Sequence, residues 1–318
     1  MERILIIGAN GQIGSELVTA LAQQHGPDKV IASDIGLDNV YGAARYTRLD
    51  VLDRDAVAGL IADEGITQVY QLAALLSATG EKAPLKAWTL NMDGLLNILE
   101  IARERGEAGK PLKVFWPSSI AAFGPNTPAE NTPQYTVMDP TSIYGISKLA
   151  GERLCEYYHA KYGVDVRSIR YPGIISFKSP PGGGTTDYAI AIFHAALKGE
   201  TYECFLGPET TLPMIYMPDA IRATIELMEA PGDQVAIRSS YNVAGVSFNP
   251  RELAAAIQSR LPAFRIAYKP DSRQQIADSW PKSLDDSRAS ADWGWKARIG
   301  VDEMVNDMLE NVDVGQAA

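Results

Sequence analysis

The side chains best suited to proton transfer are a tyrosine and a lysine four residues apart. Tyr144 and Lys148 open a strongly helical segment, and this spacing places both on one face of the helix. An ammonium beside a phenol favours the phenolate, which can act as a general base toward an alcohol. Ser118 and Ser119 follow a predicted strand, where a hydroxyl can hold the substrate oxygen. The alternative is a structural tyrosine at the start of an amphipathic helix, because such pairs also arise by chance.

Three glycines follow the first predicted strand and open the first predicted helix. Gly8, Gly11 and Gly14 form the pattern Gly-x-x-Gly-x-x-Gly, which lets the backbone turn sharply and approach a pyrophosphate at a helix N-terminus. Gln12 and Ile13 lie within the pattern and are expected to contact the same ligand. Glycines in such a turn can also be purely structural, but the strand and helix around them favour a dinucleotide.

An aspartate ends the second predicted strand, and it indicates which dinucleotide is bound. Asp34 lies twenty residues after Gly14, where a carboxylate accepts hydrogen bonds from the adenosine ribose and repels a 2′-phosphate. Ile-Gly-Leu follows, with neither Arg nor Lys, so NAD is favoured over NADP. Its positive nicotinamide would further favour the Tyr144 phenolate. Asp50 and Val51 are expected to contact the adenine, although an exposed loop aspartate is nearly as plausible there.

The first half of the chain alternates short aliphatic runs with longer amphipathic segments. Predicted strands span Arg3–Ile7, Val30–Ser33, Gln68–Leu72, Lys113–Trp116 and Val166–Tyr171, and predicted helices span Gly14–Gln24, Arg54–Glu64, Leu90–Arg105 and Ser142–Tyr162. This alternation indicates βαβ units and a parallel sheet covered by helices on both faces. The predicted fold class is therefore α/β, with a Rossmann-type doubly wound parallel sheet.

The pattern changes after Tyr171, where prolines and glycines precede a predicted helix at Asp187–Leu197. We predict an NAD-binding Rossmann domain of residues 1–172 and 215–247, and a smaller, discontinuous C-terminal substrate lobe of residues 173–214 and 248–318. The predicted helix Asp219–Glu229 and strand Ser240–Val243 return to the main sheet, whereas Pro250–Arg260 and Val301–Asn311 are predicted helices of the smaller lobe. The glycines at 182–184 suggest a mobile entrance that closes on the substrate.

Composition excludes several classes of partner. The chain has 318 residues, and its 39 acidic and 29 basic residues give a net charge of -10, which disfavours nucleic acid. The N-terminal apolar run is too short for a signal peptide or a membrane span, so we expect a cytoplasmic protein without membrane contact. Two cysteines and three histidines lie far apart in the sequence, so no metal site is expected.

The motifs described so far resemble those of the extended short-chain dehydrogenase/reductases over nearly the whole chain. The matching segments are Gly8-Ala-Asn-Gly-Gln-Ile-Gly14, Asp34, Leu72-Ala-Ala74, Asn91, Pro117-Ser-Ser119 and Tyr144-x-x-x-Lys148. The resemblance implies that the backbone of Leu72, Ala73 and Ala74 passes close to the cofactor and that Asn91 supports the active-site architecture. It also implies that Ser119 is the catalytic serine and that Lys148 holds the nicotinamide ribose.

One departure from the family pattern bears on the substrate. Members that act on nucleotide-sugars usually carry Arg-Tyr-Phe-Asn at the end of the sixth strand, whereas this chain has Arg170-Tyr-Pro-Gly173. The change removes a polar group that a large polar ligand would need, while Tyr171 is expected beside the cofactor. Further segments are similar to the short-chain type of L-threonine 3-dehydrogenases: 75–81, 170–175, 182–188, 278–281 and 284–287. This resemblance implies NAD-dependent oxidation of L-threonine at its β-carbon to 2-amino-3-oxobutyrate.

A small amino-acid substrate needs donors for its carboxylate and acceptors for its ammonium. Thr185, Thr186 and Asp187 can supply both, although this segment is equally a good N-cap for the helix that follows. Ser77 is a second candidate, and Trp280 either closes the pocket or serves packing. The alternative functions are a nucleotide-sugar epimerase or dehydratase of the same family and a non-catalytic NAD sensor. The helices at 90–105 and 142–162 are apolar around much of their circumference, which favours a homodimer.

Overall fold

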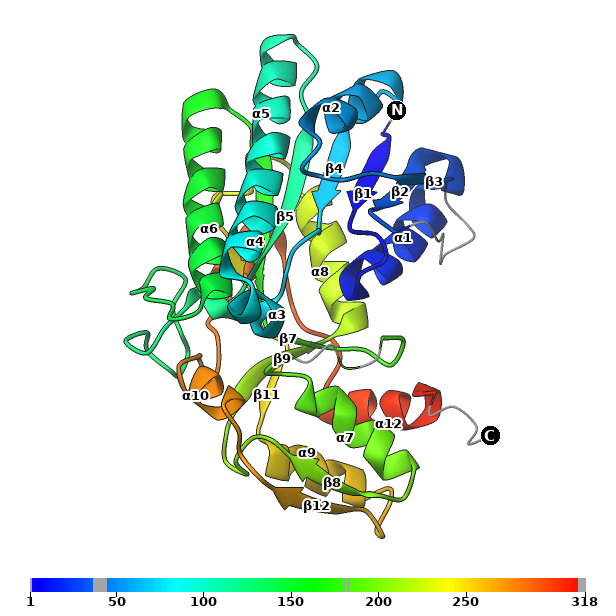
Figure 1. The fold of residues 1–318 in the computed structure, drawn as a ribbon, viewed down its shortest axis with the longest axis vertical. Helices are drawn as coiled ribbons and strands as arrows, with labels where there is room; N and C mark the ends of the chain where they lie inside the picture. The colour runs from blue at the N-terminus through cyan, green and yellow to red at the C-terminus, as the bar shows by residue number, and fades with distance from the viewer. Residues whose placement is uncertain (1, 37–44, 180, 182–183, 314–318) are drawn as a thin grey trace.

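A seven-stranded parallel sheet forms the centre of the larger part of the molecule. The computed structural model describes residues 2–36, 45–179, 181 and 184–313. The order of the strands is β10-β6-β5-β4-β1-β2-β3, so the chain winds outward from β1 in both directions (Figure 1). The strands are β1 (Ile4–Ile7), β2 (Val30–Asp34), β3 (Arg45–Arg48), β4 (Gln68–Gln71), β5 (Lys113–Ser119), β6 (Asp165–Tyr171) and β10 (Tyr241–Asn242).

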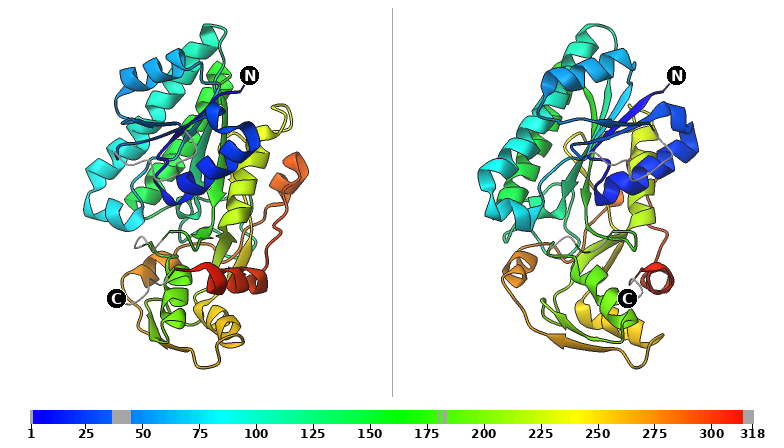
Figure 2. Two further views of the ribbon diagram at one scale, coloured as in Figure 1. Left: turned by 90° about the vertical axis from the view of Figure 1, so that its right-hand side faces the viewer. Right: turned by 45° about the vertical axis from the view of Figure 1, so that its right-hand side comes forward.

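Helices cover both faces of this sheet, and the alternation of side chains along β1 shows why. Ile4 and Ile6 pack into the core beneath α1 (Gln12–His25) and α8 (Met217–Glu229). Leu5 and Ile7 point the other way, into the core beneath α2 (Arg54–Asp63), α5 (Gly94–Glu107) and α6 (Ile143–Tyr162). Because successive residues of a strand face opposite sides, an apolar strand without alternation needs a helical layer on each side (Figure 2). The predicted α/β doubly wound fold is confirmed.

The smaller part of the molecule has its own core and two small sheets (Figure 1). One sheet has the order β11-β9-β7 and the other pairs β12 with β8. Their strands are β7 (Gly173–Ile175), β8 (Thr201–Cys204), β9 (Leu212–Tyr216), β11 (Val246–Phe248) and β12 (Arg265–Tyr268), and the helices of this region are α7 (Tyr188–Leu197), α9 (Pro250–Gln258), α10 (Arg273–Asp278) and α12 (Val301–Asn311). Side chains from α7, α9 and α12 form one continuous apolar cluster.

The predicted strands and helices of the main sheet are present with ends shifted by a few residues, and three features differ. The predicted single helix Leu90–Arg105 begins as a π-helical turn, Thr89–Asp93, before α5 continues it. The strand predicted at Ser240–Val243 is β10, which pairs with β6 in the main sheet as expected, whereas β9 was not predicted and joins the smaller sheet. The short helices α3 (Ser77–Lys82), α4 (Pro84–Trp88) and α11 (Ser287–Trp293) were not predicted. No helix within the described ranges is long and apolar enough to cross a membrane.

Candidate active site

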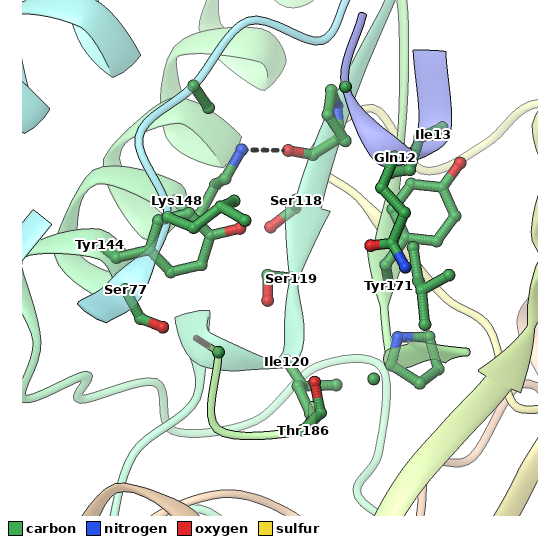
Figure 3. A pocket seen from close by; sticks show the side chains of 18 of the residues that line it. Gln12, Ile13, Ser77, Ser118, Ser119, Ile120, Tyr144, Lys148, Tyr171 and Thr186 are labelled. Carbon is green, nitrogen blue, oxygen red and sulfur yellow. Dashed lines mark hydrogen bonds between the residues drawn. The ribbon is translucent and has the colours of Figure 1, made fainter. Parts of the chain in front are cut away.

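A cavity of about 240 Å³ lies where the carboxyl ends of the central strands meet the smaller part of the molecule. Residues from the glycine loop, the ends of β5 and β6, helix α6 and the segment before α7 line it (Figure 3). Among these are Gly8, Gly11, Gln12, Ile13, Gly14, Leu72, Ala74, Ser77, Ser119, Tyr144, Lys148, Tyr171, Thr185, Thr186 and Trp280. Sequence reasoning had assigned each of them to the cofactor or the substrate, and the fold brings them together at the edge where parallel sheets bind ligands.

The glycine loop forms a cradle that side chains would fill. Gly8 has φ 84, and a Cβ there would lie 2.7 Å from the Ala73 nitrogen. A Cβ on Gly14 would lie 2.3 Å from the Gly8 carbonyl oxygen. The first helical hydrogen bond of α1 runs from the Ser15 amide to Gly11, so the preceding amides point toward the cavity end of the helix. This geometry fits a pyrophosphate, as the motif predicts.

Asp34 lies beside this cradle at the end of β2. Its Oδ2 accepts a hydrogen bond from the Asn10 amide at 3.1 Å, and its Oδ1 accepts one from the Gly36 amide at 3.3 Å. The carboxylate is therefore fixed at the edge of the glycine loop, where an adenosine ribose would follow the pyrophosphate. A dinucleotide without a 2′-phosphate fits these residues.

Five residues that were expected to bind the cofactor lie outside the cavity lining: Asp34, Asp50, Val51, Ala73 and Asn91. Asp50 is exposed and its Oδ1 accepts a hydrogen bond from the Leu52 amide at 3.0 Å, while Val51 is buried in the core beneath α2 and α5. Their contact with adenine stays a prediction. Ala73 backs Gly8, and its contact with the cofactor also stays a prediction. Asp34 has the position just described, which leaves its ribose contact untested.

Asn91 is buried in the π-helical turn and holds the loop after β4. Its Oδ1 accepts a hydrogen bond from the Leu75 amide at 2.8 Å, and its Nδ2 donates to the Leu75 carbonyl at 3.1 Å and to the Ser147 hydroxyl at 3.2 Å. The wider turn at Thr89–Asp93 places this side chain between the β4 loop and α6. Asn91 therefore lies behind the cavity wall, in agreement with a supporting position.

Lys148 is buried and points at the end of β5. Its Nζ donates a hydrogen bond to the Pro117 carbonyl at 2.6 Å and lies 4.5 Å from the centroid of the Trp116 ring. Burial lowers the pKa of Lys148 to about 7, and the nearby Cys155 and Glu152 oppose that shift. The Lys148 amine is thus partly protonated at neutral pH.

Tyr144 and Lys148 share one face of α6, as predicted, and burial acts strongly on the phenol. Lys148 Nζ lies 5.5 Å from the centroid of the Tyr144 ring. Burial raises the pKa of Tyr144 to about 12, and a hydrogen bond with Ser119 opposes this only partly. Desolvation therefore dominates the phenol within the protein itself, and the expectation that Lys148 and the positive nicotinamide together favour the phenolate stays a prediction.

The structure separates the two adjacent serines. Ser119 opens a 3₁₀ turn at Ile120–Ala122, where its Oγ accepts a hydrogen bond from the Ala121 amide at 3.2 Å, and its side chain faces the cavity beside Tyr144 (Figure 3). Ser118 is buried and donates to Glu152 Oε1 at 2.6 Å. Ser119 is the serine placed to meet a substrate oxygen.

The smaller part of the molecule closes the other side of the cavity. Thr185 is buried and Thr186 is half-buried. Neither threonine is the N-cap of α7. Asp187 holds that position without a side-chain cap, and its Oδ2 accepts a hydrogen bond from the Gly184 amide at 2.8 Å. The glycines at 182 and 183, where we predict a mobile entrance, lie outside the described residues.

Gly173 explains how Thr186 reaches this wall. A Cβ at Gly173 would lie 2.4 Å from the Met214 sulfur and 2.6 Å from Thr186 Cγ2. No side chain fits there without displacing one of these groups, so Thr186 and Met214 take the space that a longer side chain at this position would need. This steric reason for Gly173 was not visible in the sequence.

Comparison with known proteins places the chain in a family. Residues 4–244 match the model of the NAD dependent epimerase/dehydratase family. The chain therefore belongs to that family, whose Rossmann fold and glycine loop it has.

Three relatives are similar over almost the whole chain. A GalE-like L-threonine dehydrogenase from Cupriavidus necator, in its holo form, is 61% identical with a TM-score of 0.95, covering 98% of this chain and 100% of that chain. The mitochondrial L-threonine 3-dehydrogenase of Bos taurus is 44% identical over 311 residues, 97% of this chain and 82% of that protein. A monomeric L-threonine 3-dehydrogenase from a metagenome, in its apo form, is 45% identical with a TM-score of 0.92, covering 97% of this chain and 98% of that chain.

Proposed function

We propose that this protein is an NAD-dependent dehydrogenase that oxidises L-threonine at its β-carbon to 2-amino-3-oxobutyrate. The observation that carries the proposal is the meeting of Ser119, Tyr144 and Lys148 with the glycine cradle in one small cavity. Its similarity to proteins named L-threonine dehydrogenase, at up to 61% identity among those above, supports the choice of substrate.

The residues divide the work of removing a proton and a hydride from a secondary alcohol. Bound NAD supplies the acceptor for the hydride that leaves the β-carbon. Ser119 hydrogen-bonds the substrate hydroxyl and holds it beside Tyr144. The Tyr144 phenolate takes the hydroxyl proton as the carbonyl forms. Lys148 lies beneath the phenol and, when charged, adds to the positive charge of the bound cofactor in favouring the phenolate.

Recognition of the substrate falls to polar groups on the opposite wall. Thr185 and Thr186 offer hydroxyls to the carboxylate from this wall, and Ser77 offers another from beside Tyr144 (Figure 3). The Asp187 carboxylate lies on the same wall and can accept from the ammonium. Trp280 covers the methyl end of the pocket in this proposal, since it lines the cavity while packing against the apolar cluster of the smaller part.

A substrate panel tests the proposal. Purified protein with NAD should form NADH with L-threonine, and only weakly with L-serine or 3-hydroxybutyrate. Epimerisation of a UDP-sugar without net NADH, and no reaction with threonine, would replace the proposal by the nucleotide-sugar alternative. A non-catalytic NAD sensor would bind the cofactor and give neither reaction.

The division of labour between the two parts of the chain is also proposed. Residues 1–172 and 215–247 would hold NAD, and residues 173–214 and 248–318 would hold the substrate. The separate apolar cluster beneath α7, α9 and α12 supports this division, whereas Ala289 and Trp295 of the range 248–318 pack in the core of the large sheet. The cavity would then lie at the junction, where closure of one part on the other can exclude water.

A homodimer through the helices at 90–105 and 142–162 stays a proposal. Apolar side chains are exposed on these helices and on the neighbouring α4. Ile146 on α6 is 42% exposed, and Leu85 on α4 is 84% exposed. Trp88, at 39%, extends the same apolar surface. Sedimentation of the purified protein distinguishes a dimer from the monomer described for the metagenomic relative.

A further inference from the structure

The face of α6 that carries Tyr144 and Lys148 continues for one more turn to a buried acid. Glu152 follows Lys148 by four residues, so the three side chains form one stripe along the helix. The Glu152 side chain is 0% exposed. A carboxylate without solvent must be paired and hydrogen-bonded, because an isolated buried charge costs several kcal/mol.

Glu152 is paired with an arginine on β6. Arg170 donates from Nε to Oε1 at 2.9 Å and from Nη2 to Oε2 at 2.8 Å, a two-point contact between fully buried groups. Arg170 Nη1 donates in turn to the Gln134 carbonyl and to Asn242 Oδ1, each at 2.9 Å. The arginine is thereby held from three directions, and it fixes the carboxylate in one orientation.

The same carboxylate reaches the strand end that carries the active-site serine. Glu152 Oε1 accepts the Ser118 hydroxyl at 2.6 Å. Ser118 lies between two residues of the site on β5. The Pro117 carbonyl before it accepts a hydrogen bond from Lys148 Nζ at 2.6 Å, and Ser119 after it faces the cavity. Two hydrogen bonds therefore tie α6 to consecutive residues of β5, directly before the serine that meets the substrate.

Glu152 is also the buried negative charge that faces Lys148. From α6 itself, Lys148 meets Tyr144, Glu152 and Cys155, and burial raises the pKa of the Cys155 thiol so that it stays neutral. From β5 it meets the Pro117 carbonyl and the Trp116 ring, neither of which titrates. The π-helical turn contributes the neutral Asn91, which contacts α6 at Ser147.

We propose that Glu152 is a positioning residue for the reaction, which supplies the anion beside Lys148 and, through Ser118, fixes the strand end that carries Ser119. The proposal rests on the proposed function, since it assigns these effects to the Tyr144–Lys148 proton transfer. In this role Glu152 contacts neither substrate nor cofactor. It acts through the two groups that do.

The test compares the pH profile of kcat for L-threonine oxidation in the wild type and in Glu152→Gln. Removing an anion favours loss of a proton from both Lys148 and Tyr144, so the rising limb should move about one pH unit lower. The maximum kcat should fall, because the lysine then loses the proton in place of the phenol. If Glu152 had a purely structural role, the substitution would change the amount of folded protein and would leave the pH of the rising limb of the kcat profile unchanged.

One further variant and a control complete the comparison. Glu152→Asp keeps the charge, so its limb should coincide with that of the wild type. Glu156→Gln removes a half-exposed acid one turn further along α6, paired with Arg153, and should change neither limb nor kcat. Folded Glu152→Gln with a wild-type limb overturns the proposal.

Where Glu152→Gln does not fold, Ser118→Ala provides the test. Loss of this hydrogen bond to a charged carboxylate should lower kcat roughly ten- to a hundredfold, with an unchanged rising limb and an unchanged KM for NAD. An unchanged kcat in Ser118→Ala overturns the proposal. A wild type that does not oxidise threonine instead overturns the proposed function, so the two failures are distinguishable.

Discussion

The close packing of Gly173 leads to a prediction whose size follows from the structure. In Gly173→Ala, the new Cβ would lie 2.4 Å from the Met214 sulfur and 2.6 Å from Thr186 Cγ2. Relief of such overpacking costs about 1–3 kcal/mol, and the yielding group should be Thr186, because it stands at the cavity. If this cost appears in substrate binding, kcat/KM for L-threonine falls roughly 5- to 150-fold.

The assay combines initial rates of NADH formation with the thermal midpoint and the affinity for NAD. We expect the loss in kcat/KM to come mainly from a higher KM for threonine, with NAD affinity nearly unchanged. The matched control is Gly59→Ala on the exposed part of α2, where a Cβ meets nothing within 4 Å. Threonine kinetics within about twofold of the wild type in a folded Gly173→Ala protein would refute the steric reasoning.

Three further predictions concern the proton and cofactor sites. Tyr144→Phe should abolish turnover while NAD affinity stays within a few-fold of the wild type. Wild-type activity would remove Tyr144 from the mechanism. Burial puts the pKa of Tyr144 at about 12, so the phenolate fraction grows as pH rises. The rate should therefore increase from mildly acidic to alkaline pH, and a flat profile contradicts the base role. Asp34→Asn should raise the KM for NAD roughly ten- to a hundredfold, since a charge-assisted hydrogen bond contributes about 1.5–3 kcal/mol. The same variant should also prefer NAD over NADP less strongly. An unchanged ratio of the KM values for NADP and NAD contradicts the role of Asp34.

The main sheet was predictable because its strands are buried on both faces. An uninterrupted apolar run such as Ile4–Ile7, followed by a glycine turn, has few other interpretations. The edge strand β3 was missed, since Arg45–Arg48 carries charged ends and no apolar run. The small sheets of the substrate region escaped for a related reason: β7 and β11 have three residues each, and their partners are distant in sequence.

The candidate site was predictable where backbone geometry dictates residue type. The glycine loop and the spacing of Tyr144 and Lys148 follow from local rules, and the structure brings them together. The sign of the Tyr144 pKa shift was not predictable, because it depends on burial by segments far away in the sequence. Glu152 was missed although its spacing from Lys148 was a signal, since its partner Arg170 becomes a neighbour only when β6 pairs with β5.

Isotope transfer tests the central claim most directly. The purified protein should be given NAD with L-threonine deuterated at the β-carbon, and separately with L-threonine deuterated at the α-carbon. The account predicts one deuterium in the reduced cofactor from the β-labelled substrate and none from the α-labelled substrate, with 2-amino-3-oxobutyrate as the organic product. Deuterium in the reduced cofactor from the α-position, or no reduced cofactor from either substrate, would contradict it.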